Sequence, residues 1–347
     1  MARLFRHELA KILFMPVLWV FVVLCVVFNI FTTPTWLRTV DFDISTPFQY
    51  NVFENHNTSE IAEAYISALN LTGRVAERMR AKYATLQYSV DEAAISGHSF
   101  SPYFGEHTSI MHISLFHGVG GVMGRLLMQG LLLAALLALL AVGYEQINST
   151  EHMVYATKTG RRILLYKISA SITAGIGVYL LLAAVTFAIY FAIFDYSGVW
   201  GGNVSSGFNY IVDFIGILPF TTWRSFTVLS YFWASFGVGL GLVLCFSLLG
   251  VIIGTLSKNG YIGFLMVVLV NALCLAVPLV IPRGMYVHFV SFHTPIWLWF
   301  NSHLWFTDGG AMTLWLNFEL WGMGFSLITL TVLCVLSVKN FEKRNIA

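Results

Sequence analysis

Long apolar runs separated by polar connections dominate the chain. Six such runs stand out: Val17–Phe31, Val122–Tyr144, Ile168–Phe194, Phe226–Leu256, Tyr261–Ile281 and Asn317–Val338. A helix needs roughly 20 apolar residues to cross the hydrocarbon core of a bilayer. The runs reach or approach that length, and the first is extended by the segment before it. The pattern predicts an all-α membrane protein with six transmembrane helices.

The N-terminal segment has an amphipathic helical pattern. Leu4, Phe5, Leu9, Ile12 and Leu13 share one helical face, while Arg3, His7 and Lys11 lie on another. That spacing is typical of a helix lying in the interface plane. We therefore predict that residues 1–16 form an elbow helix, with Arg3, Arg6 and Lys11 as its basic side chains, and that Pro16 marks the bend into the first span, 17–31. The alternative is the basic flank of an ordinary signal-anchor.

A polar stretch of residues 32–118 separates the first two apolar runs. Because ordinary connections are far shorter, this stretch is expected to be a folded insert or a functional loop. Asn57 and Glu60 resemble a capping box, and Ser89 and Glu92 could cap a second short helix. Apolar positions then recur at helical spacing, with Gly73 as a possible break: Ile61, Tyr65, Ala68, Thr72, Val75 and Met79. We predict a largely helical insert whose apolar stripe packs on itself, on a partner or on cargo.

Two later connections, 195–225 and 282–316, are rich in aromatic residues. Tyr210–Trp223 is apolar enough to lie at the outer interface. Trp297 and Trp299 belong to the second connection, and tryptophan concentrates at membrane–water boundaries. An interfacial platform is the simpler interpretation, and an outer gate or a surface for amphipathic cargo is the functional one.

A few residues within or near the spans are candidates for packing or transport. Gly120 and Gly124 approach the second span with the spacing of close helix packing, and the glycines of the fourth span, including Gly250 and Gly254, are expected to pack helices. Arg125 and Asn271 are polar residues in apolar segments. A snorkelling arginine and an interhelical hydrogen bond are the plain interpretations, and a role in cargo binding or gating is the alternative.

Composition and charge support this topology. Of 347 residues, 57% are hydrophobic and only 10% are charged. Basic residues gather between the second and third runs and at the C-terminus, in Lys339, Lys343 and Arg344. Because short basic loops stay in the cytoplasm, both termini are expected there, with the insert outside. A net charge of +2 makes a nucleic-acid partner improbable. All four cysteines lie in apolar runs, so no disulfide framework is expected in the insert, which suits a bacterial plasma membrane.

No catalytic motif is apparent. The chain contains neither a Walker sequence nor H-E-x-x-H nor a paired-cysteine motif. His107, His112 and His117 recur every fifth residue, a spacing that turns successive side chains away from a common ligand on a helix. We therefore expect no metal site, no cofactor held by this chain and no enzymatic activity of its own.

The loop at residues 145–167 carries the most specific pattern. An acidic residue, Glu145, closes the second span, and then come Ser149 and Thr150, the patch Met153–Tyr155, Gly160-Arg161-Arg162, and Lys167 at the opening of the third span. Together with the N-terminal elbow, this arrangement resembles the type-2 permeases of ATP-binding cassette (ABC) transporters. The chain departs from that family at Ser149, where Gly is frequent, and at Lys158-Thr159-Gly160, where Pro often precedes the Arg.

The resemblance implies a function and a set of partners. In that family the loop forms a coupling helix that docks on a separate ATPase subunit, which binds ATP and Mg. Two permease protomers, identical or related, assemble with two ATPase subunits. The contact set implied here is Glu145, Ser149, Thr150, Glu151, His152, Tyr155, Lys158, Arg161 and Arg162. The candidates for cargo or gating are Arg125, Asn271, Trp297 and Trp299. The expected function is export of a hydrophobic or amphipathic substrate such as a peptide antibiotic, a lipid or a drug.

Two other function classes stay open. A secondary transporter or channel would need no ATPase, although the spans are poor in charged residues for coupling ions and no inverted repeat is visible. A membrane receptor or interaction protein would use the insert to bind its partner. An ATPase that accompanies the chain would separate the first class from both of these.

Overall fold

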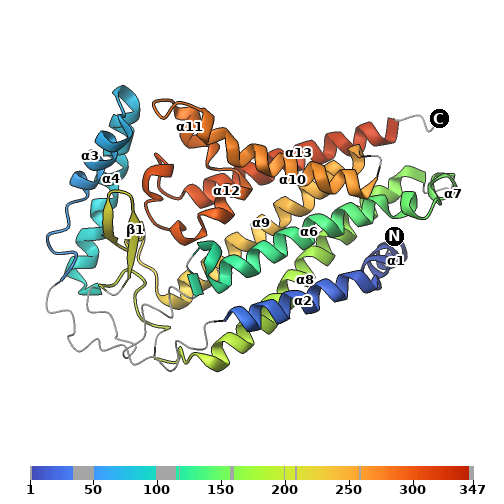
Figure 1. Cartoon of the computed structure of the whole chain (residues 1–347), viewed down its shortest axis with the longest axis horizontal. Helices are drawn as coiled ribbons and strands as arrows, with labels where there is room; N and C mark the ends of the chain where they lie inside the picture. Colours follow the sequence, from blue (N-terminus) through green and yellow to red (C-terminus); the bar gives the residue numbers. More distant parts are fainter. Residues whose placement is uncertain are drawn as a thin grey trace.

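Long apolar helices run side by side along the long axis of the molecule (Figure 1). The computed structural model describes residues 2–33, 51–98, 115–116, 118–156, 160–198, 200–207, 209–257 and 259–343. Within these residues, five helices are long and apolar enough to cross a membrane: α6 (Val122–Ile147), α8 (Ile163–Ile193), α9 (Val228–Leu256), α10 (Gly260–Val280) and α13 (Phe318–Lys343). The chain is therefore a mostly helical, multi-pass membrane protein, as predicted.

The N-terminal pair of helices supplies a sixth span if it is counted as one unit. Helix α1 (Ala2–Leu13) and helix α2 (Pro16–Thr32) are bent by 58° relative to each other. Pro16 is the first residue of α2, where its missing N–H group costs no intrahelical bond. The bend therefore lies at the residue that the sequence indicates.

Helix α6 is the centre of the bundle, and small residues let its neighbours approach it. It packs between α8 and α9, and 78% of its apolar window is buried, against 17% for α10 and for α13. A Cβ added to Gly250 of α9 would lie 2.6 Å from the carbonyl oxygen of Ala135, and one at Gly254 would lie 3.1 Å from the Cβ of Val142. The predicted packing role of these two glycines is confirmed.

The predicted helix face of Gly120 and Gly124 is wrong. Gly120 lies in the short helix η4 (Gly118–Gly120), before α6 begins. Gly124 instead makes room for the backbone of Gly118, which folds back against it. The short spacing therefore serves a local turn rather than contact between two long helices.

The described part of the insert is a helical hairpin of α3 (Thr58–Leu69) and α4 (Gly73–Ile95). The Asn57 side chain accepts a hydrogen bond from the Ser59 N–H and donates one to Glu60, so the predicted cap of α3 is confirmed. Gly73 has a φ of 55° and begins α4, which confirms the break. The cap predicted at Ser89 is wrong: α4 continues past it, and its hydroxyl donates to the Trp223 carbonyl at 2.9 Å.

The two aromatic connections fold differently from a flat interfacial layer. Residues 210–219 form an antiparallel hairpin of β1 (Tyr210–Asp213) and β2 (Gly216–Pro219), which the sequence analysis did not predict. The later connection folds into α11 (Tyr286–Ser291), α12 (Pro295–Phe300), η6 (Ser302–Leu304) and η7 (Gly310–Met312). Helix α12 packs against α6, α9, α10 and α13, so this segment folds back among the long helices.

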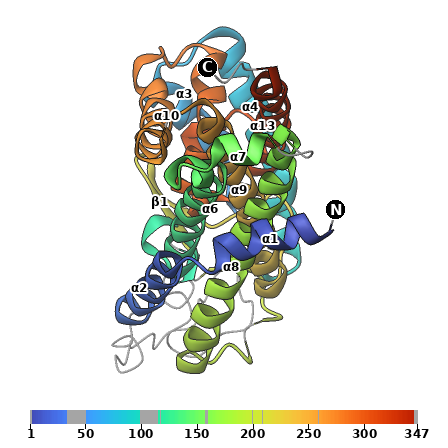
Figure 2. The ribbon, with the colours of Figure 1, turned by 90° about the vertical axis from the view of Figure 1, so that its right-hand side faces the viewer.

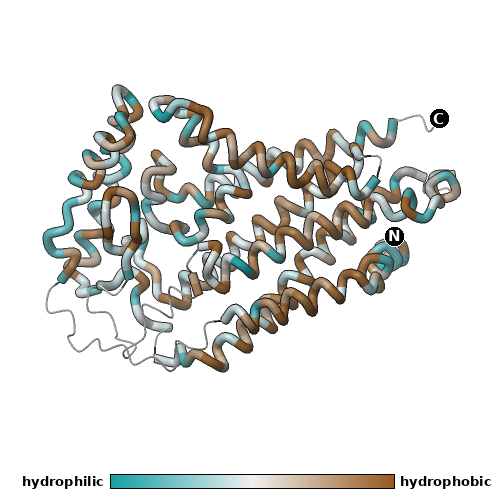
Figure 3. The backbone as a smooth tube through the Cα atoms, viewed as in Figure 1, coloured by the Kyte–Doolittle hydropathy of each residue, from teal (hydrophilic) through white to brown (hydrophobic). Residues whose placement is uncertain are grey.

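The molecule has two distinct ends. The N-terminus, the short helix α7 (Glu151–Tyr155) and the C-terminus lie at one of them, which we call the α7 end (Figure 1). Helices α3, α4 and α11 and the β hairpin lie at the other, which we call the insert end. Hydrophobic residues cover the long helices between the two ends, and hydrophilic residues concentrate at the ends (Figure 3).

Candidate functional site

Four charged side chains from three helices meet at the α7 end. Lys11 of α1 lies 2.6 Å from Glu8 and 3.2 Å from Glu145 of α6. Lys167 of α8 forms ion pairs with both carboxylates, at 3.4 Å to Glu8 and closer still to Glu145. The Lys167 ammonium also donates to the Ala141 carbonyl at 2.7 Å. We call these four residues the ion cluster.

The ion cluster is buried and balanced in charge. Glu8, Glu145 and Lys167 each expose 2% or less of their surface. Removing such charges from water is costly unless each is paired, and here two carboxylates meet two ammonium groups. The cluster therefore fastens α1 to the ends of α6 and α8, and Figure 2 shows α1 lying across α8 at this end.

This burial changes the role of one predicted contact residue. Glu145 was placed in the ATPase contact set, but its side chain is enclosed by Lys11 and Lys167 and is not presented at the surface. Glu8 and Lys167 were not among the predicted site residues. Only the spacing of Glu8 and Lys11, three residues apart, hinted at part of the cluster, because such pairs meet on a helix.

Beyond the ion cluster, the loop between α6 and α8 forms α7 and the short helix η5 (Gly160–Arg162). Ser149 is exposed and has a φ of 54°, in the left-handed region that favours glycine. The Thr150 N–H donates to the Glu145 carbonyl at 2.9 Å, so the loop leaves α6 in a tight turn directly above the ion cluster. A force applied to α7 would therefore reach the junction of α1, α6 and α8.

Exposed side chains of the predicted contact set lie on this loop, and exposed basic side chains of the predicted elbow lie on α1. His152 and Arg162 are exposed, as are Arg3 and Arg6 of the elbow. Met153 of α7, which lies outside the long apolar helices, exposes 75% of its surface. Lys158 falls outside the described residues, and the side chains of Glu151, Tyr155 and Arg161 are not described either. The loop presents mixed basic and apolar groups at the α7 end.

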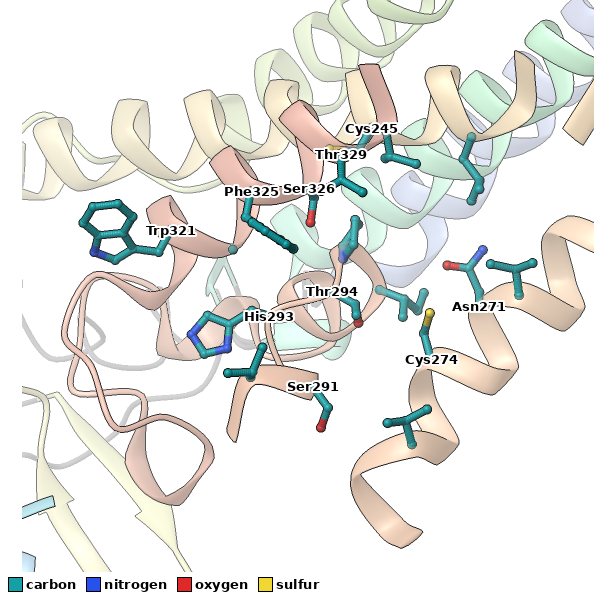
Figure 4. Close-up of a pocket in the computed structure, with 18 of the residues that line it drawn as sticks. Cys245, Asn271, Cys274, Ser291, His293, Thr294, Trp321, Phe325, Ser326 and Thr329 are labelled. Carbon is teal, nitrogen blue, oxygen red and sulfur yellow. The ribbon is translucent and has the colours of Figure 1, made fainter. Parts of the chain in front are cut away.

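A large cavity lies toward the insert end. Its volume is about 840 Å³, and its walls come from α9, α10, α11, α12 and α13 (Figure 4). Apolar side chains such as Phe246, Val270 and Phe325 form most of the lining. Among the described residues that line it there is no lysine, arginine, aspartate or glutamate. The cavity is therefore suited to an apolar occupant.

Only one of the four cargo or gate candidates lines this cavity. Asn271 of α10 is in its wall. Trp297 donates from its ring nitrogen to the Cys274 carbonyl at 3.0 Å, and Trp299 donates to the Gly124 carbonyl at 2.9 Å. Arg125 donates to the Gly120 carbonyl at 2.8 Å. The two tryptophans and the arginine thus hold the connection and the turn in place.

A second polar cluster clamps the insert onto the rest of the protein. Buried Lys82 of α4 donates to the carbonyls of Asp308, Gly310 and Thr313 at 3.1, 2.7 and 2.9 Å. Burial lowers the pKa of Lys82 to about 8. The Tyr83 hydroxyl donates to the Asp308 carboxylate. Because residues 308–313 lead directly to Trp315 in the cavity wall, the insert and the cavity share a support.

Over the described ranges, no group of three or more His, Cys, Asp or Glu side chains is placed to hold a metal ion. His107, His112 and His117 lie outside those ranges.

No protein-family model, no curated protein and no solved structure matches this chain. The function must therefore be argued from the geometry of the two ends and the cavity.

Proposed function

We propose that this chain is the transmembrane permease subunit of an ATP-driven ABC exporter in the plasma membrane. It pairs with a second permease protomer, identical or related, and a separate ATPase subunit supplies ATP hydrolysis. The α7 end faces the cytoplasm and the insert end faces outside. The exported substrate is hydrophobic or amphipathic.

The observation that carries this proposal is the location of α7 at the end of the molecule where α1, α6 and α8 are joined. It stands at the same end of the molecule as both termini (Figure 1), and the ion cluster connects α1, α6 and α8 at that end. Since the buried charges stay paired only while the three helices keep their spacing, motion of α7 is passed to the spans together. A cytoplasmic ATPase that binds α7 could drive such motion.

Exposed apolar side chains support a protein partner at this end. Met153 of α7 and Ile147 at the end of α6 expose 75% and 61% of their surfaces. Large apolar groups exposed beside charged ones are typical of interaction sites. The basic Arg162, at the end of the short helix η5 that packs against α7, would suit an acidic rim on the partner.

The test is purification of the complex from the native membrane, with wild type compared against Met153→Asp. We expect the wild-type chain to retain a protein with a Walker motif and ATPase activity. The ATPase activity that co-purifies with Met153→Asp is expected to be about tenfold lower, because the variant places a charge in an apolar contact. Ile95→Asp is the matched control, since Ile95 is a highly exposed apolar helical residue at the insert end. If Met153→Asp retains the ATPase as well as the wild type does, α7 is not the contact with it. If no ATPase accompanies the wild type, the secondary-transporter interpretation takes the place of the exporter.

A further inference from the structure

Two largely exposed apolar helices, α10 and α13, form facing walls of the cavity (Figure 4). Its wall includes Trp321, Phe325 and Thr329 of α13, which are exposed, and the facing wall comes from α10. Only 17% of the apolar window of each helix is buried. An apolar molecule dissolved in the bilayer could therefore enter without crossing a polar layer.

Apolar walls alone do not select an occupant here. Lipid tails are as apolar as the side chains that line the cavity, so moving an alkyl chain from the bilayer into it gains little free energy. Selectivity must come from the polar atoms of the wall. Their identity thus indicates the chemistry of the occupant.

Three polar side chains are available for hydrogen bonding. The Thr294 hydroxyl is buried and has no hydrogen-bond partner among the described residues. The Asn271 amide nitrogen donates to the Val267 carbonyl at 2.8 Å, which leaves its oxygen as an acceptor. His293 donates from Nδ1 to the Phe289 carbonyl at 2.9 Å, so its Nε2 is an acceptor in the neutral ring. All three residues line the cavity (Figure 4).

These groups match an uncharged polar head. A hydroxyl can donate to the Asn271 oxygen or to His293 Nε2 and can accept from the Thr294 hydroxyl, whereas an alkyl group can do neither. A phosphate or an ammonium group would find no opposite charge in the described lining, and burying an unpaired charge is strongly unfavourable. The cavity therefore discriminates by charge rather than by chain length.

We propose that this cavity binds an uncharged amphiphile with an apolar body and a hydroxyl-bearing head, and that such molecules are the cargo class of the exporter. The assignment of these molecules as cargo rests on the proposed function, whereas their binding to the cavity does not. A bilayer lipid and an exported product can share this chemistry, and the site recognises the chemistry in either case.

Photolabelling of the purified chain in phosphatidylcholine nanodiscs tests the binding. The probe is a monoacylglycerol with a diazirine in its acyl chain, compared with the same chain bearing a phosphate or a primary amine head. We expect the neutral probe to label peptides from α10 and α13 about tenfold more than either charged probe. Equal labelling by all three probes would overturn the proposal.

Three variants locate the label. Thr329→Trp fills the cavity and is expected to reduce labelling about tenfold, while Ile328→Trp, on the adjacent lipid-exposed position, leaves it unchanged. Thr294→Val keeps the shape but removes the hydroxyl, and is expected to reduce labelling by the neutral probe about fivefold. Equal loss in Thr329→Trp and Ile328→Trp would contradict a site in the cavity. Cross-links between two copies through α10 and α13, in place of lipid labelling, would show that a second protomer fills the opening and would also contradict it.

The cargo assignment has its own readout. In the complex with its ATPase, we expect the neutral probe to stimulate ATP hydrolysis and the charged probes not to do so. Charge-selective labelling without stimulation would leave the binding site in place and overturn the cargo assignment. Failure to recover any ATPase would count against the exporter and not against the site, because labelling is measured on the chain alone.

Discussion

Buried charges decide how single residues matter in this protein. Glu145 and Lys167 expose 1% of their surfaces and pair with each other and with residues of α1. Lys82 exposes 4% of its surface and donates to three backbone carbonyls. By contrast, Arg80 and Glu63 form an ion pair that is more than half exposed. The first two groups are expected to be critical for stability, and the exposed pair is not.

A double-mutant cycle tests the ion cluster. Glu145→Gln leaves two lysines facing one carboxylate, and Lys167→Met leaves two carboxylates facing one lysine. Each single change is expected to lower the free energy of unfolding by about 3 kcal/mol, because it strands a buried charge. The double variant restores the balance and should cost less than the sum of the two. Additive losses in denaturant unfolding would mean that the two side chains do not interact.

Lys82→Met tests the clamp on the insert. Three carbonyl groups lose their donor, so the local free energy of opening is expected to fall by about 2–3 kcal/mol. Hydrogen exchange in α4 and in residues 308–313 would rise accordingly. Arg80→Met, two residues away on the same helix, removes the exposed ion pair. It should change the local free energy of opening by less than about 0.5 kcal/mol. Similar exchange in the two variants would refute the clamp.

At the scale of elements, the apolar runs predicted more of the helices and strands correctly than the pattern of polar residues did. The runs that suggested α8, α9, α10 and α13 each correspond to a long helix, and Pro16 and Asn57 were correctly assigned as a bend and a cap. Periodicity works for these elements because their environment is uniformly apolar or because the signal is local.

The elements that sequence reasoning missed depend on distant contacts. The strands β1 and β2 have four residues each, too few for a periodic signal, and they are held by pairing with each other. Helix α12 reads as an interfacial aromatic stretch, yet Leu298 is fully buried among the long helices. The ion cluster joins Lys11 to Glu145, 134 positions later, and the cavity lining extends from Cys245 to Leu330, so no local pattern could reveal either of them.

At the scale of the whole molecule, the two ends have different tasks. The α7 end offers exposed apolar and basic groups above a rigid, buried charge cluster. The insert end holds a helical hairpin clamped to the connection that helps to line the cavity. Helices α6, α8 and α9 join the ends, so a change of helix spacing at one end must alter packing at the other.

The most direct test of the exporter proposal is a photocross-link from α7. Met153 is replaced by photoreactive benzoylphenylalanine in cells, the native membranes are irradiated, and cross-linked partners are identified by mass spectrometry, with Ile95 as the control position. The proposal predicts that position 153 alone captures a protein bearing a Walker motif, on the cytoplasmic side. Capture of no such protein at position 153, or the same capture at position 95, would contradict the assignment of α7 as the contact with an ATPase.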